Sequence, residues 1–155
     1  MNKLSYDNGH DSFLAEDYKA ARREFAETLK SIDEHHECYY KVTSYLGLAQ
    51  VLNSDRNGLL LCRDAASSDA RDADLHLNLA CAEWHVNNRQ RAVEAINRGR
   101  EIDANHQQLV RAARLIDPRK RRILPFLARD HYLNRLLGRM MRRNGYELTV
   151  HQLLY

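Results

Sequence analysis

Apolar residues recur along the first 116 positions at the three- and four-residue spacing of amphipathic helices, in runs separated by short polar segments. The clearest pair of runs lies between Asp74 and His106 and flanks the polar turn 87–89. Its apolar positions are Leu75, Leu79, Ala82 and Val86 in the first run, and Ala92, Val93, Ile96, Gly99 and Ile102 in the second. The pattern predicts a helical hairpin in which each helix buries one stripe.

Two further hairpins are predicted before this one. The middle hairpin has a first helix starting near Tyr39, a turn over 53–57 and a second helix that begins at Gly58. The first hairpin is less regular. Its second helix runs from about Ala15 to Ile32, and its first helix covers about 4–14. Asn8–Gly9 falls inside that first helix and alternatively marks a turn.

Two more helices are expected after the third hairpin. The first covers 106–116 and ends at Asp117–Pro118, because a residue before proline is disfavoured in helical geometry. The second covers 131–143, where Leu133, Leu136, Leu137, Met140 and Met141 make an apolar stripe. Between them lie a basic run at 119–122 and a segment containing Pro125, for which an extended conformation is expected. The ending YELTVHQLLY is apolar, and its pattern predicts no element.

The third hairpin resembles a tetratricopeptide repeat, whose pattern is W-x2-L-G-x2-Y, then A-x3-F, then P. Leu79–Ala80 stands at the Leu-Gly place and Ala92-x3-Ile96 at the A-x3-F place, while His76 and Glu83 replace the aromatic residues. Two other parts of the chain also match this pattern: Leu46–Gly47 in the middle hairpin matches Leu-Gly, and Ala21-x3-Phe25 in the first hairpin matches A-x3-F. The small residues Ala21, Gly58 and Ala92 lie 37 and 34 positions apart, close to the family period of about 34.

The resemblance implies an all-α fold of three hairpins stacked in a right-handed superhelix, followed by a capping helix and a basic amphipathic helix. We therefore expect a repeat domain over 1–117 and a basic C-terminal segment over 118–155. The segment that starts at Asp117 also resembles a tail that follows the last repeat in some bacterial repeat proteins, which hints at a bacterial source.

Charge divides the chain at about the same point. Residues 1–110 carry 13 Lys and Arg against 18 Asp and Glu, whereas residues 111–143 carry 11 against 2. The composition, with 6 Gly and 2 Pro in 155 residues, suits a helical domain. No apolar run reaches the length of a membrane span and the first residues lack a secretory signal, so a cytoplasmic protein is expected. Cys38, Cys62 and Cys81 lack C-x-x-C spacing, and we expect reduced thiols.

The family arrangement lines a concave groove with the first helix of each repeat. Mapped onto this sequence, the expected lining is Tyr6, His10 and Phe13, then Lys41, Ser44, Tyr45, Leu48 and Leu52, then Asp74, Leu77, Asn78, Cys81 and His85. This lining is mixed, with aromatic and aliphatic surface and few charges, so an apolar or amphipathic protein segment would bury area there. The alternative is that the C-terminal segment of the chain itself, for example residues 124–127, occupies the groove.

Some repeat domains hold a peptide carboxylate with Lys, Asn and Arg side chains on successive first helices. Lys41 and Asn78 are candidates here, but Tyr45 and Leu48 stand where further polar clamp residues are needed, which disfavours this mode.

The basic segment has three interpretations. Its Leu and Met stripe covers the end of the stack while arginines face water, or it adsorbs to an anionic membrane surface, or it binds nucleic acid. The residues concerned are Arg119, Lys120, Arg121, Arg122, Arg135, Arg139, Arg142 and Arg143. The same stripe also allows a homo-oligomer.

No metal, cofactor or catalytic site is predicted. The run 35–38 holds His, Glu and Cys but adjacent side chains rarely converge on one ion, and His76, Cys81 and His85 do not share a helical stripe. No spacing suggests a nucleophile with a base and an orienting group, and no Gly-rich phosphate loop is present. We therefore expect a non-enzymatic adaptor or chaperone that binds another protein. The alternative is a peripheral membrane or nucleic-acid-associated protein acting through residues 119–143.

Overall fold

The chain is described from a computed structural model, which places residues 3–116 and 150–154. These residues form helices and connecting turns, with no strand among them. The helices are α1 (Lys3–Leu14), α2 (Tyr18–Lys30), α3 (Tyr39–Leu52), α4 (Gly58–Ser68), α5 (Ala73–His85), α6 (Arg89–Ile102), α7 (Gln107–Ile116) and α9 (Val150–Leu154). The all-helical prediction is confirmed for this part of the chain, and the basic helix predicted over 131–143 lies outside it.

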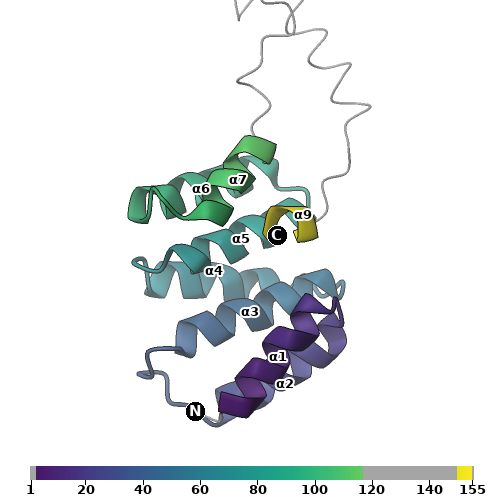
Figure 1. The fold of residues 1–155 in the computed structure, drawn as a ribbon. Helices are drawn as coiled ribbons and strands as arrows, with labels where there is room; N and C mark the ends of the chain where they lie inside the picture. The colour runs from purple at the N-terminus through teal and green to yellow at the C-terminus, as the bar shows by residue number, and fades with distance from the viewer. Residues whose placement is uncertain (1–2, 117–149, 155) are drawn as a thin grey trace, which may run out of the picture.

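The helices pack as three consecutive hairpins that stack on one another (Figure 1). Helix α1 packs on α2, α3 on α4 and α5 on α6, while α2 contacts α3, α4 contacts α5 and α6 contacts α7. The first helices α3 and α5 also contact each other. The fold is therefore repeat-like, because each hairpin buries its apolar faces against the hairpins beside it.

All three hairpins turn with the same hydrogen bonds. Glu16, Ser54 and Asn87 have positive φ angles of 61°, 67° and 67°. The amide of the next residue then bonds back to a carbonyl of the first helix, as from Asp55 to Gln50 at 2.9 Å and from Asn88 to Glu83 at 2.8 Å. This is the Schellman ending of a helix, in which one left-handed residue reverses the chain. The repetition of one turn at three places is structural evidence of repetition independent of the apolar pattern.

The connections between hairpins also share one geometry. Asp33, Asp69 and Asp103 follow α2, α4 and α6, and each carboxylate accepts a hydrogen bond from the backbone amide two residues later, at 2.9, 3.3 and 2.9 Å. These aspartates lie 36 and 34 positions apart. An aspartate that bonds its own backbone in this way fixes a turn, so the spacing of the stack is set locally at each connection.

Small residues let neighbouring helices approach closely. Ala21 and Ala92 are fully buried and Gly58 is buried, as the repeat pattern predicts. A Cβ atom placed on Gly47 would lie 2.6 Å from the carbonyl oxygen of Gly58, so α3 and α4 meet backbone to backbone. Gly9 lies within α1, where an added Cβ would lie 2.8 Å from the Phe25 ring, and the alternative of a turn at this position is therefore wrong.

Three buried polar side chains, those of Glu83, Asn78 and Ser44, are paired across helices. The Glu83 side chain on α5 is 2% exposed, and it accepts hydrogen bonds from Arg63 on α4 at 2.8 Å and from Asn88 at 2.8 Å. Asn78 donates to the Ser44 hydroxyl at 3.0 Å, which joins α5 to α3. Removing one partner of a buried charge pair leaves the other without compensation, so these contacts favour one register of the stack.

Helix α9 comes from the end of the chain and packs against α5 and α7. Its side chains Val150, Leu153 and Leu154 are buried. Residues 150–154 therefore belong to the packed stack, although the sequence analysis placed them in a separate C-terminal segment. The sequence predicted no element there.

The shared turn gives a test of local strain. Ser54 holds a left-handed conformation that L-residues adopt at a cost of about 1–2 kcal/mol, whereas glycine adopts it freely but loses more entropy on folding. We expect Ser54→Gly to raise the free energy of unfolding by about 0.5–1 kcal/mol, measured by urea denaturation. Ser67→Gly, the same change at an exposed helical position of α4, should lower it by about 0.5 kcal/mol. If both variants shift stability in the same direction, the turn is not strained.

Candidate functional site: the first-helix face

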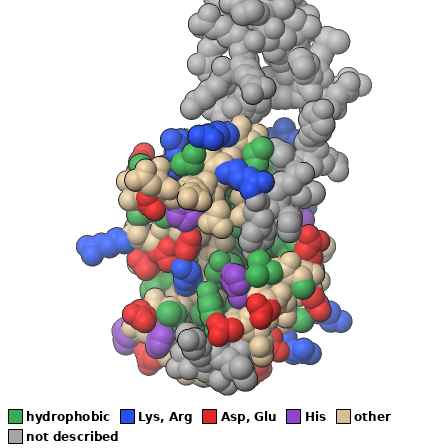
Figure 2. All heavy atoms as spheres, in the orientation of Figure 1, with side chains coloured by type: hydrophobic (Ala, Val, Ile, Leu, Met, Phe, Trp, Pro, Cys, Tyr) green, Lys and Arg blue, Asp and Glu red, His purple; other side chains and the backbone are tan. Residues whose placement is uncertain are grey.

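The face formed by the first helices α1, α3 and α5, with α7 beside them, is the candidate site. Figure 2 views this side of the molecule, where hydrophobic side chains gather near the middle beside a histidine, with acidic side chains around them. The other helix of each hairpin lies behind this face in the same view (Figure 1). We call it the first-helix face.

Aromatic side chains occupy the end of the face nearest α1. Tyr45 on α3 is half-buried, and its ring contacts those of Phe13, Phe25 and His10 at centroid distances of 5.7, 5.6 and 5.6 Å. Tyr6 stacks on His10 at 6.4 Å. Tyr6, His10 and Tyr45 each keep part of their surface exposed, so they form an aromatic patch that a partner can reach. Aromatic rings supply large contact areas with little conformational freedom to lose on binding.

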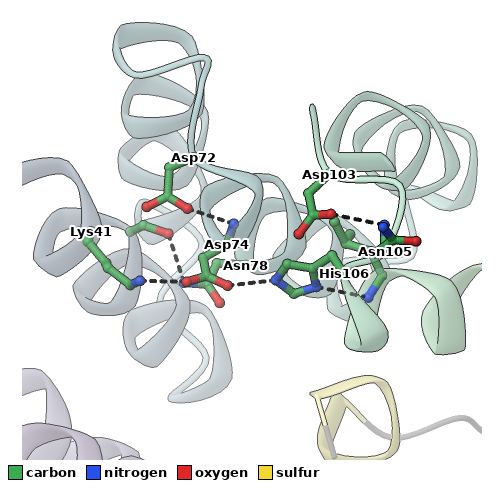
Figure 3. A network of polar contacts seen from close by, with 9 residues as sticks. Lys41, Asp72, Asp74, Asn78, Asp103, Asn105 and His106 are labelled. Carbon is green, nitrogen blue, oxygen red and sulfur yellow. Dashed lines mark hydrogen bonds and ion pairs between the residues drawn. The ribbon is translucent and has the colours of Figure 1, made fainter. Parts of the chain in front are cut away.

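A polar row crosses the middle of the face (Figure 3). The Lys41 ammonium on α3 lies 2.5 Å from one carboxylate oxygen of Asp74 on α5, and His106 Nε2 lies 2.8 Å from the other. The Leu109 amide donates to His106 Nδ1 at 3.3 Å, so Nε2 carries the hydrogen that is donated to Asp74. The Asp74 carboxylate thereby joins α3, α5 and the residue that precedes α7.

The electrostatics of this row follow from its pairing. Burial alone would raise the pKa of Asp74, but hydrogen bonds from Lys41 and His106 outweigh it, and the pKa falls below its ordinary value of 3.8. Burial alone would lower the pKa of Lys41, but the bond to Asp74 reverses the direction and raises it. Both groups therefore stay charged near neutral pH, and their charges compensate each other.

The structure buries about half of the predicted groove lining. Phe13, Ser44, Leu48, Leu77, Asn78 and Cys81 are each at most 3% exposed, so in this structure they do not form an open wall. The remaining predicted residues keep some exposure, and these are Tyr6, His10, Lys41, Tyr45, Leu52, Asp74 and His85. Leu77 and Cys81 lie on α5, the helix on which α9 packs.

Lys41 and Asn78, the two candidates for a carboxylate clamp, already have partners within the fold, Asp74 and Ser44. A terminal carboxylate would have to displace these contacts. The arrangement therefore favours partners that bind through apolar area over those that bind through a terminal carboxylate.

A shallow pocket of about 530 Å3 opens beside the polar row. It lies between the connections that follow α4 and α6, and Asp69, Arg71, Asp72, Asp74, Asp103 and His106 supply its polar lining. Most of these side chains already have hydrogen-bond partners within the fold. Asp69, Asp72 and Asp103 accept hydrogen bonds from backbone amides, and Asp74 accepts from Lys41 and His106. The pocket is best explained by the turns that shape it.

Two buried cysteines and one histidine of a loop have structural roles. Burial raises the pKa of both Cys62 and Cys81, which keeps these thiols protonated and unreactive. In the loop before α3, His36 Nδ1 accepts a hydrogen bond from the Cys38 amide at 3.1 Å. Within the part of the chain that the structure places, no three His, Cys, Asp or Glu side chains are grouped to hold a metal ion.

The basic residues predicted at 119–122, 135, 139, 142 and 143 lie outside the described residues. Within 3–116 and 150–154, none of the helices has both the length and the apolar character needed to cross a bilayer. Comparison of the sequence with protein-family models and with curated proteins finds no match.

Sequence reasoning missed two features of the site. His106 was expected only as a helix start, yet it completes the polar row through its imidazole. No helix was expected over 150–154, although occupation of the groove by the C-terminal segment was one of the two alternatives; its example, residues 124–127, lies outside the described residues. The only sequence signal for this helix is the spacing of Val150, Leu153 and Leu154. A helix of five residues is too short for such a spacing to be distinguished from chance.

The lowered pKa of Asp74 gives a pH test. Its stabilising contribution is complete above the ordinary value of 3.8 and is lost as the pH falls through the lower value of the folded state. We expect Asp74→Asn to lower the free energy of unfolding by about 1 kcal/mol at pH 7, since the pair is about one-third exposed. The deficit should shrink at about pH 3, measured by urea denaturation at both pH values.

Asp64→Asn is the matched control because this carboxylate is exposed on α4. It should change stability little at either pH. A deficit of Asp74→Asn that stays constant from pH 7 down to about pH 3 would show that the carboxylate charge does not hold the row together.

Proposed function

We propose that this protein is a non-enzymatic scaffold of the tetratricopeptide type, which binds an amphipathic helical segment of another protein along the first-helix face. A cytoplasmic adaptor or chaperone is the role that fits such a scaffold. The three hairpins would then form a short superhelix, and their first helices would line its concave side.

One observation carries the proposal: the first-helix face already holds a short amphipathic helix. Helix α9 packs on α5 and α7 with Val150, Leu153 and Leu154 buried. A surface that accepts one such helix has the shape and the apolar character to accept another, which is the helix-in-groove mode of peptide recognition.

The aromatic patch supplies the rest of the binding surface. Tyr6, His10 and Tyr45 remain partly exposed at the other end of the same face, next to the Lys41–Asp74 pair. Tyrosine is enriched among the energetically dominant residues of protein interfaces. The proposed partner segment would therefore place an apolar side chain over Tyr45.

Photo-crosslinking tests the position of the partner without removing core packing. A benzophenone amino acid is placed at Tyr45 or at His10 in the tagged full chain, and at Leu60 as the control, since Leu60 is 64% exposed on α4, away from the face. After irradiation in cells of the source organism, crosslinked peptides are identified by mass spectrometry. We expect positions 45 and 10 to crosslink to the same protein, at a segment with apolar residues spaced by three and four.

The control position should yield far less of that product, because benzophenone reacts only with groups that lie in direct contact with it. Equal crosslinking from position 60, or crosslinking from position 60 alone, would rule out the first-helix face as the binding surface. Circular dichroism of each variant confirms that the helical fold is retained.

A further inference from the structure

Helix α9 depends on its contacts with the stack. It has five residues, and isolated helices of fewer than about 12–15 residues are marginal in water. Val150, Leu153 and Leu154 have the relative spacing 0, 3 and 4, which places them on one side of a helix, and they are 6%, 1% and 6% exposed. Packing on α5 and α7 is therefore what keeps this segment in place.

Helix α5, one of the two helices that α9 contacts, is buried on most of its surface. Nine of its thirteen residues are buried, where a surface helix would show one buried stripe. Its neighbours α3, α4 and α6 account for the sides within the stack, and α9 lies on it as well. Leu77 and Cys81, which the repeat pattern assigns to the groove, are among the buried residues.

The two ends of the first-helix face therefore differ. At the end formed by α1 and α3, Tyr6, His10 and Tyr45 are partly exposed. At the end formed by α5 and α7, a segment of the same chain is bound (Figure 1). Thirty-three residues separate Ile116 from Val150, so this bound segment is attached to the stack by covalent connection.

We infer that α9 is an internal competitor of the partner: it occupies the α5–α7 end of the first-helix face, and a partner helix with apolar residues spaced 0, 3 and 4 must displace it. The inference rests on the proposed function and adds its regulation. A segment of the same chain competes with a free segment at an effective concentration set by its covalent connection to the stack, so the intact chain binds a free segment more weakly than a chain whose α9 is released.

The probe is a fluorescent peptide of residues 144–155, NGYELTVHQLLY, which contains α9. Its affinity is measured by fluorescence anisotropy for three forms of the full chain. They are the wild type, Leu153→Asp with Leu154→Asp to release α9, and Leu60→Asp as the matched control at an exposed leucine.

We expect the released variant to bind the peptide at least about tenfold more tightly than the wild type or the control does. A peptide carrying the same two Leu→Asp changes should not bind. Leu154→Ala in the full chain should give an intermediate gain, because it shortens one of the three buried side chains.

Three results would overturn the inference. Equal peptide binding by the wild type and the released variant would show that α9 does not compete with the peptide for this face. No binding by a folded released variant, or unfolding of both the released and the Leu154→Ala variants, would make α9 an ordinary part of the core. Dimers in the wild type that vanish on release would show that α9 is exchanged between two copies.

Failure of this inference is distinguishable from failure of the proposed function. If peptide binding fails but crosslinking from positions 45 and 10 persists, the face binds a partner without α9 as competitor. If crosslinking from these positions is absent also in the released variant, the proposed function itself fails.

Discussion

Close packing around α5 is the constraint on which the rest of the structure depends. This helix is buried on most of its surface, so every side needs a complementary neighbour. Its Ala80, Ala82 and Ala73 keep the contacts short, while Leu75 and Leu77 fill the space between helices. Protein interiors tolerate few voids, and α3, α4, α6 and α9 must therefore meet α5 at compatible distances. The repeated turns supply those distances, because each fixes the angle at which the chain enters the next helix.

Polar contacts determine which arrangement of this core is chosen. Apolar packing alone would allow neighbouring helices to slide by a turn, since small residues recur along them. The Asn78–Ser44 bond and the Glu83 contacts with Arg63 and Asn88 exist in only one register. Asp74 extends the same logic to the surface, where Lys41 and His106 tie α3 and the start of α7 to α5. The row that crosses the candidate site is thus also part of what aligns the hairpins.

The sequence predicted the helices well because their signal is local and repeated. The expected start at Tyr39, the turn at 53–57 and the end at Ile116 agree with α3, α4 and α7. The left-handed conformation within the turns was harder to predict, because Glu16 and Ser54 stand at positions where glycine is the usual indicator. Of the site, Lys41, Asp74 and the aromatic residues were selected from the repeat pattern alone. Which of the lining residues stay open was not predictable, because Leu77 lies on a helix that a segment some 70 positions away covers.

The energetics of α9 explain why such a contact is suited to regulation. Burial of its three apolar side chains stabilises the docked state by about 1.5–3 kcal/mol each. Ordering its five residues costs about 1–2 kcal/mol each in backbone entropy alone. These two contributions are of similar size, so the docked state is favoured by a small net free energy; about 1.4 kcal/mol in its favour corresponds to a tenfold weakening of peptide binding. A surplus of this size can be overcome by a ligand that prefers the released state, whereas a much larger surplus could not. Under the proposed regulation, the short length of α9 is the property that would let the chain cover the α5–α7 end of this face and still yield it to a competing helix.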